Sequence, residues 1–117
     1  MLDRAHRLTS SAGFASAVRS GRRAGTRTLV LHLARISDTE QPRVGFVVSR
    51  SVGNAVTRNL VKRRLRSLAR ERLTSLPGSA VLVVRALPAA ATASYDGLAD
   101  DFDVALRRVH GEPASSR

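Results

Sequence analysis

Seven cationic side chains lie within the twenty residues from Gly53 to Arg72, where the only acid is Glu71. Guanidinium groups donate paired hydrogen bonds in a plane that matches phosphate oxygens, so this density of arginine favours phosphate binding. Like charges at i and i+4, such as Lys62 and Arg66, destabilise an isolated helix by about 0.2–0.5 kcal/mol per pair. The spacing therefore indicates a polyanionic partner outside the chain.

Helical periodicity separates these cations from an apolar stripe. At about 100° per residue, one face of the predicted helix contains Val61, Leu65, Leu68 and Ala69. A neighbouring sector of about 100° contains one amide and four cations. Its members, called the basic sector below, are Asn59, Lys62, Arg63, Arg66 and Arg70. We expect Arg58 to project from the first turn on the side of the sheet, and Arg64 to lie across the helix.

The other residues that could do chemistry form no comparable pattern. The chain has no cysteine, which excludes thiolate ligands and thiol nucleophiles. Its histidines are too far apart in sequence for the ligand spacing of a zinc site, and we expect His32, in a strand, to be a satisfied packing residue. Asp100, Asp101 and Asp103 occur near the start of a predicted helix, where acids favour the macrodipole. We expect these acids to be exposed, and no catalytic or metal-binding residue in this chain.

Composition places the chain among small basic domains. Its 117 residues fit a single domain, 1–117, with a flexible tail from about 111. The net charge of +11 predicts a nucleic-acid partner. A genome rich in arginine codons is an alternative for the excess of arginine, but it does not explain the clustering. No apolar run reaches the roughly 18 residues of a membrane span, and no secretion signal is evident, so we expect a cytoplasmic protein without a membrane partner.

The elements that must position the basic sector follow from periodicity and turn residues. We expect helices at 10–21, from the Asn54 cap to a stop at Pro77 and Gly78, and at 95–109. The buried stripe of the last helix is predicted to contain Leu98, Phe102, Ala105, Leu106 and Val109. Strands are expected at 28–36, 43–50 and 79–86, and a basic turn at 22–27.

The predicted order, α-β-β-α-β-α, corresponds to an α+β sandwich in which helices pack on a small, mostly antiparallel sheet. The short polar connection between the first two strands predicts an antiparallel hairpin. The third strand is almost unbroken in apolarity, which predicts a central position.

RNA is favoured over DNA by the motifs that the sequence does not contain. We find no helix-turn-helix spacing, zinc ligand set or heptad zipper, and no paired aromatics of an RRM sheet. The predicted binding is directed to phosphates and to shape.

Three segments together resemble the protein subunit of bacterial ribonuclease P. They are RLTSSAGFASAVRSGRR (7–23), VGFVVSRSVGNAVTRNLVKRRLR (44–66) and the strand that follows, so that the resemblance covers about 7–109. Its specific part is the pattern RNxxKRxxR, which is met by Arg58, Asn59, Lys62, Arg63 and Arg66.

This resemblance implies a subunit of an endoribonuclease that removes the 5′ leader from precursor tRNA. The chemistry would belong to the RNA subunit, with magnesium expected at that RNA and no cofactor bound by the protein alone. The implied partners are the catalytic RNA and the leader, and no DNA is expected. The predicted RNA-binding residues are Arg58, Asn59, Lys62, Arg63, Arg66 and Arg70.

A second implied surface is a cleft between the first helix and the sheet that holds the single-stranded leader. Its predicted residues are Phe14, Val18, Ser49, Arg50 and Arg85. Val18 departs from the family pattern, in which many members carry a second aromatic at that position. The resemblance also implies a left-handed crossover through the basic helix, against the right-handed rule.

Two alternatives stay open at this point. One is a basic ribosomal-type or other structural protein that binds nucleic acid. The other is a stand-alone endonuclease that uses the acids of the last helix.

Overall fold

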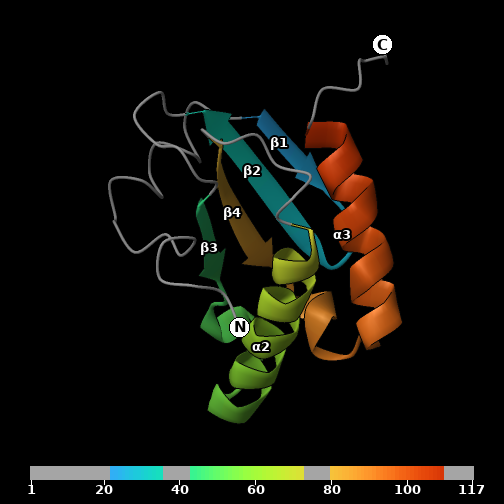
Figure 1. Ribbon diagram of the computed structural model, residues 1–117. Coiled ribbons are helices and arrows are strands. Elements are labelled where there is room, and N and C mark those ends of the chain that lie inside the picture. Colours follow the sequence, from blue (N-terminus) through green and yellow to red (C-terminus); the bar gives the residue numbers. More distant parts are fainter. Residues whose placement is uncertain (1–21, 36–42, 73–79, 110–117) are drawn as a thin grey trace.

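A four-stranded sheet carries two α-helices in the part of the chain that the structure describes (Figure 1). The computed structural model describes residues 22–35, 43–72 and 80–109. The elements are β1 (Arg22–Gly25), β2 (Leu29–Arg35), β3 (Arg43–Val47), the 3-10 helix η2 (Arg50–Val52), α2 (Ala55–Glu71), β4 (Ala80–Ala86), the 3-10 helix η4 (Pro88–Ala91) and α3 (Tyr95–Val109). The helix expected at 10–21 and the tail lie outside the described residues. The predicted stop of the basic helix at Pro77 and Gly78 is wrong, because α2 already ends at Glu71.

The sheet has the order β1-β2-β4-β3, in which β1 with β2 and β2 with β4 are antiparallel and β3 with β4 is parallel. The predicted hairpin of β2 and β3 is therefore wrong, because β4 lies between them. The central position predicted for β4 is confirmed. Val81, Leu82, Val83 and Val84 are each at most 1% exposed, and only an inner strand buries both of its faces so completely.

The strand β1 corrects the basic turn that was predicted for 22–27. Residues Arg22–Gly25 pair with β2, and the chain turns only afterwards, where the Thr26 amide donates to the Leu29 carbonyl at 2.8 Å. An edge strand needs little apolar surface, and here Ala24 alone is buried while Arg22 and Arg23 are exposed. Charged residues on an edge strand also oppose pairing with other chains.

The connection from β3 through α2 to β4 is left-handed. In Figure 1 both strands run downward, α2 rises in front of the sheet, and β4 lies to the right of β3. This arrangement confirms the crossover that the family resemblance implied, against the usual preference for right-handed connections.

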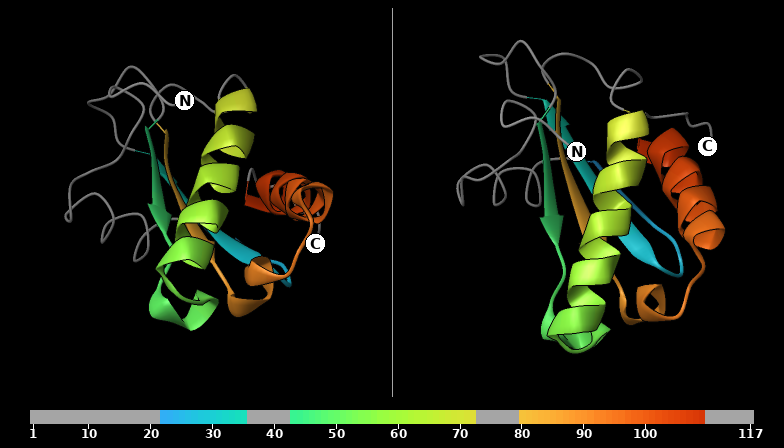
Figure 2. Two further views of the ribbon diagram at one scale, coloured as in Figure 1. Left: turned by 90° about the horizontal axis from the view of Figure 1, so that it is seen from below. Right: turned by 60° about the horizontal axis from the view of Figure 1, so that its bottom comes forward.

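Both helices pack on one face of the sheet, where they lie side by side (Figure 2). Alternate residues of the central strands, such as Leu31 of β2 and Leu82 of β4, form a common core with Leu65 of α2 and Phe102 of α3. The predicted bounds and buried stripe of α3 are confirmed in full. The opposite sheet face contains Val30, His32 and Val83, which are also buried.

Neither described helix is long and apolar enough to cross a membrane.

Candidate nucleic-acid interface

The helix α2 begins with a side-chain cap and a constrained glycine. Asn54 Oδ1 accepts a hydrogen bond from the Thr57 amide at 2.9 Å, which confirms the predicted cap. Gly53, just before it, has a φ of 155°, and a Cβ added there would lie 3.0 Å from Thr57 Cγ2. Arg58 reaches back over this turn, where its Nε donates to the Gly53 carbonyl at 3.2 Å. The first predicted RNA-binding residue is thus held at the junction of η2 and α2.

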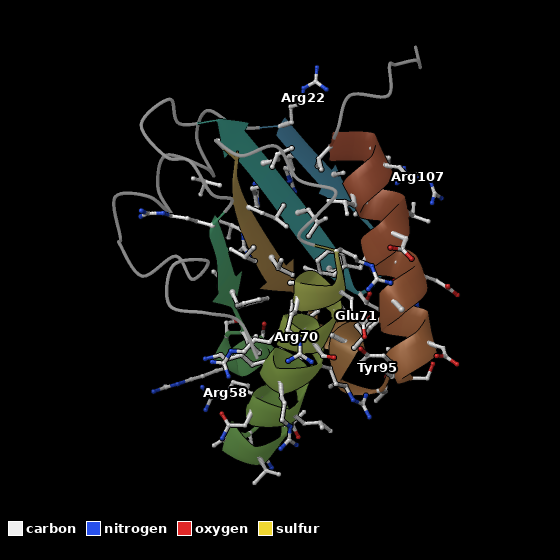
Figure 3. The ribbon with its side chains drawn as sticks, viewed as in Figure 1. Arg22, Arg58, Arg70, Glu71, Tyr95 and Arg107 are labelled. Carbon is white, nitrogen blue, oxygen red and sulfur yellow. The ribbon has the colours of Figure 1, made fainter. Side chains whose placement is uncertain are left out.

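The apolar stripe of α2 lies where periodicity predicted it. Its buried residues are Val61, Leu65, Leu68 and Ala69. In the basic sector beside them, Asn59, Arg63 and Arg70 are exposed, whereas Lys62 and Arg66 are half-buried. Figure 3 shows Arg58 on the η2 side of α2 and Glu71 on the side toward α3. The only acid of α2 is therefore directed away from the basic sector.

The cations of the basic sector keep their charge unpaired within the described chain. The ion pairs in that part of the structure join Arg72 to Glu71 at 3.2 Å and to Asp103 at 2.5 Å. None of them involves Lys62, Arg63, Arg66 or Arg70. Arg66 Nε is in addition buried without a hydrogen-bond partner among the described residues, a state that costs about 1–3 kcal/mol. Within the described residues, this side of α2 is charged, largely accessible and able to donate hydrogen bonds to phosphate oxygens.

The opposite side of α2 is fastened to the segment that contains α3. Arg64 Nη1 donates to the Ala93 carbonyl at 3.1 Å, which confirms that Arg64 lies across the helix. Tyr95 Oη donates to Ser67 Oγ at 3.0 Å. Asp103 accepts from Arg72 Nε at 2.5 Å and from Arg72 Nη2 at 3.2 Å. These contacts fix the rotation of α2 and so determine where the basic sector points.

Arg72 and Asp103 form the strongest of these links. The hydrogen bond from Arg72 lowers the pKa of the Asp103 carboxyl, and the same bond raises the pKa of Arg72. The Arg72 guanidinium also lies 5.8 Å from the centroid of the buried Phe102 ring, within the range of a cation–π contact.

The acids of α3 are less uniformly exposed than expected. Asp100 is exposed, but Asp101 and Asp103 are half-buried. Asp101 Oδ2 accepts from Thr28 Oγ1 at 2.6 Å, and Asp103 is paired with Arg72. Two of the three expected surface acids thus make tertiary contacts. The described residues contain no group of three or more histidine, cysteine or acidic side chains that could hold a metal ion.

Three predicted cleft residues lie at the same end of the sheet. Arg85 of β4 lies opposite Val47 of β3 in the parallel register, and the chain continues from Val47 to Ser49 and Arg50. All three predicted residues are exposed. Because β3 ends at Val47 and not at 50, Ser49 lies in a loop, where its Oγ is 2.8 Å from Ser51 Oγ, and Arg50 begins η2. Phe14 and Val18 lie outside the described residues.

His32 is a residue whose environment the sequence did not reveal. It is buried at 4% exposure, as expected, but neither ring nitrogen has a hydrogen-bond partner among the described residues, so the expectation of a satisfied side chain was wrong. Burial lowers the pKa of His32, and the charges of Arg23 and Arg85 lower it further. The alternation of β2 was the available signal, since it places His32 with Val30 on the sheet face away from α2 and α3.

Comparisons with known proteins agree along almost the whole sequence. The profile of the Ribonuclease P family matches residues 2–110. The Ribonuclease P protein component of Nocardioides sp. is 61% identical over 114 residues, which cover 96% of this chain and 97% of that protein. The component of Streptomyces griseus is 51% identical over 120 residues, which cover 95% and 97%.

Solved structures share the fold at lower sequence identity. A Staphylococcus aureus RNase P protein mutant with defective mRNA degradation activity superposes with a TM-score of 0.84 at 24% identity, covering 91% of this chain and 89% of that one. The RNase P protein of Thermotoga maritima gives a TM-score of 0.77 at 22% identity, covering 90% and 98%. The α+β fold class is confirmed by these neighbours and by the sheet described above.

Proposed function

Because the chain belongs to the ribonuclease P protein family, we propose that it binds the catalytic RNA of that ribonucleoprotein through the basic sector of α2. The observation that carries the proposal is the set of cations without an acidic partner in the described chain, beside a helix side that is fixed against α3. With Arg58 included, the surface offers five cations and one amide to phosphate oxygens. The ribosomal-type alternative has no comparable support, because the family match covers the same residues.

In this proposal the protein contributes binding, and the RNA contributes the chemistry. Asp101 and Asp103, two of the acids that a stand-alone nuclease would need, are engaged by Thr28 and Arg72. We assign the magnesium of the reaction to the RNA subunit. We also propose that the holoenzyme processes precursor tRNA in the cytoplasm. Arginine is well suited to this binding, because its planar fork pairs with two phosphate oxygens at once.

We also propose that the 5′ leader of precursor tRNA lies at the end of the sheet that contains Arg85, Ser49 and Arg50. These side chains come from neighbouring parallel strands and the loop after β3, and all are exposed. They offer two guanidinium groups and one hydroxyl to a single strand. Phe14 and Val18 are assigned to the same cleft by the family resemblance alone.

Two adjacent arginines of α2 give a matched test. Arg63 is exposed in the basic sector, whereas Arg64 donates to Ala93 on the opposite side. Filter binding of the in vitro transcribed catalytic RNA over a salt series should show that the five cations of this surface contribute roughly −3.5 to −4.5 to the slope of log affinity against log salt. Arg63→Gln should reduce the size of that slope by about 0.7–0.9. Arg64→Gln removes the same charge and should leave the slope unchanged.

Equal slopes for the two variants, or a wild-type slope near zero, would contradict the proposal. Cleavage of precursor tRNA at low magnesium separates it from the rival classes. The protein should stimulate cleavage by the catalytic RNA and should not cleave alone. Cleavage at the mature 5′ end by protein without RNA would favour the nuclease, and equal affinity for duplex DNA at matched salt would favour a general nucleic-acid-binding protein.

A further inference from the structure

A second group of exposed arginines lies away from the basic sector, where β1 meets the C-terminal end of α3. Its members are Arg22 of β1 and Arg107 and Arg108 of α3, which we call the β1–α3 patch. Figure 3 shows Arg22 and Arg107 at one end of the molecule, with Arg58 and Arg70 at the other. All three side chains of the patch are exposed, and none has an ion pair among the described residues.

A hydrogen bond links the helix of the patch to its strand. Arg108 Nη1 donates to the Gly25 carbonyl at 3.2 Å, so this guanidinium lies against β1. Arg22 pairs with Leu33 in the register of β1 and β2 and therefore lies on the sheet face that carries α3. The three arginines thus share the helical side of the sheet with α2.

A structural role can explain why each arginine of the patch occurs at its position, but these roles do not explain why the three occur on adjoining elements. Cations in the last turn of a helix stabilise it by about 0.3–1 kcal/mol, which is a sufficient reason for Arg107 and Arg108. A charge on an edge strand opposes aggregation, which is a sufficient reason for Arg22. After the hydrogen bond from Arg72, the charge of Arg107 also lowers the pKa of Asp103, one turn earlier on α3, but that carboxylate is paired with Arg72. Neither structural reason requires three arginines on these adjoining elements without an ion pair of their own in the described residues.

Exposed acids separate the two basic surfaces along α3. Asp96 and Asp100 lie in its first two turns and are exposed, so they repel a phosphate backbone that follows this helix from the η4 end. An RNA segment bound on α2 would therefore not continue over the first half of α3 to reach the patch.

We propose that the β1–α3 patch binds the phosphate backbone of a second, separate segment of the same catalytic RNA. The inference rests on the proposed function for its partner, and adds a contact surface to it. Arg22, Arg107 and Arg108 each supply a planar fork to phosphate oxygens. With α2, the protein then bridges two parts of the RNA fold from one side of its sheet.

The test compares four proteins on the in vitro transcribed catalytic RNA, by filter binding over a salt series and by hydroxyl-radical footprinting. The first two are the wild type and Arg63→Gln. The third, the triple variant, combines Arg22→Gln, Arg107→Gln and Arg108→Gln. The fourth, the compensated variant, adds Asp96→Asn and Asp100→Asn to the triple variant. In the triple variant, the slope of log affinity against log salt should be smaller in magnitude by roughly 2–3. Its footprint should lack one RNA segment that the wild type protects. Arg63→Gln should weaken a different segment. The compensated variant regains two of the three lost charges, but outside the patch, so it should behave like the triple variant.

Several results would overturn the proposal. One is a triple variant with the salt slope and footprint of the wild type. Another is recovery of both in the compensated variant. A third is a loss of binding that appears only when precursor tRNA is present. Arg22→Gln alone guards against misfolding, since its side chain makes no hydrogen bond within the described residues, and it should reduce the slope by about 0.7–0.9. If the wild type does not bind the catalytic RNA, the proposed function itself is wrong. If the wild type binds and the triple variant binds equally well, only the proposal for the patch is wrong.

Discussion

Breaking the link between Arg72 and Asp103 should loosen the helix pair that orients the basic sector. The perturbation is a double-mutant cycle of Arg72→Met, Asp103→Asn and the two together, which isolates the pairwise energy from the other contacts of Arg72. Both substitutions approximately preserve side-chain size. The measured quantity is the free energy of unfolding by urea, followed by far-ultraviolet circular dichroism.

The expected coupling energy follows from exposure and geometry. Exposed ion pairs contribute about 0–1 kcal/mol, and hydrogen bonds to charged groups contribute about 1.5–3 kcal/mol. The Arg72 and Asp103 side chains are 20% and 45% exposed, and two hydrogen bonds join them, at 2.5 and 3.2 Å. Solvent screening of Asp103 places the pair between the two classes, at about 1–2 kcal/mol. In a domain of roughly 100 residues this corresponds to a change in Tm of about 4–8 °C.

The coupling should disappear in acid. The pKa of Asp103 is lower in the folded chain than in the unfolded one, so its contribution is complete above the ordinary aspartate value near 4 and is lost as the pH falls through the folded pKa. The pKa of Arg72 is raised in the folded chain, so its contribution would be lost only at pH values above the pKa of an ordinary arginine. We therefore expect the full coupling at pH 7 and a clear decrease toward pH 2.5.

Asp100→Asn is the matched control, because Asp100 lies on the same helix, is exposed and has no partner among the described residues. It should change the free energy of unfolding by less than about 0.5 kcal/mol. A coupling energy below about 0.3 kcal/mol at pH 7, or one that is equal at both pH values, would refute the reasoning.

Three further changes test the elements around the interface. Asn54→Ala removes the cap on the Thr57 amide and should cost about 1 kcal/mol of stability in urea unfolding, whereas an unchanged midpoint would mean that the cap is not needed. Gly53→Ala should also destabilise, because the backbone φ of 155° and the contact with Thr57 both oppose a Cβ; a Tm equal to that of the wild type would contradict this. His32→Leu removes a buried imidazole with a lowered pKa, so the loss of stability that the wild type shows below about pH 6.5 should be smaller in the variant. Equal pH dependence from pH 7.5 to 5.5 would show that His32 is not responsible.

Local periodicity predicted the buried faces of α2 and α3 well, because each helix packs on the core with one face. The stripe from Val61 to Ala69 and the stripe from Leu98 to Val109 both recur at helical spacing, and the structure confirms them. The basic sector was predictable for the same reason, since a cation beside a buried stripe has few places to point. The links from Arg64 to Ala93 and from Arg72 to Asp103 were not predictable, because they join elements far apart in the sequence.

Strand pairing was the part that local patterns misjudged. The short polar connection after β2 favours a hairpin, yet the apolarity of β4 on both faces requires neighbours on both sides. Placing β4 between β2 and β3 satisfies this requirement and separates the two strands. The strand β1 was missed because only Ala24 is buried there, so that two arginines dominate its pattern.

The position of β4 has a consequence for synthesis on the ribosome. β2 and β3 leave the exit tunnel first, but each pairs with β4, whose residues Ala80–Ala86 are translated after the whole of α2. Because domains fold as units when their segments have emerged, and distant pairings form slowly, the arginine-rich helix emerges before β4 can join β3 to the paired strands β1 and β2. Translation thus completes this cationic helix before the sheet that supports it.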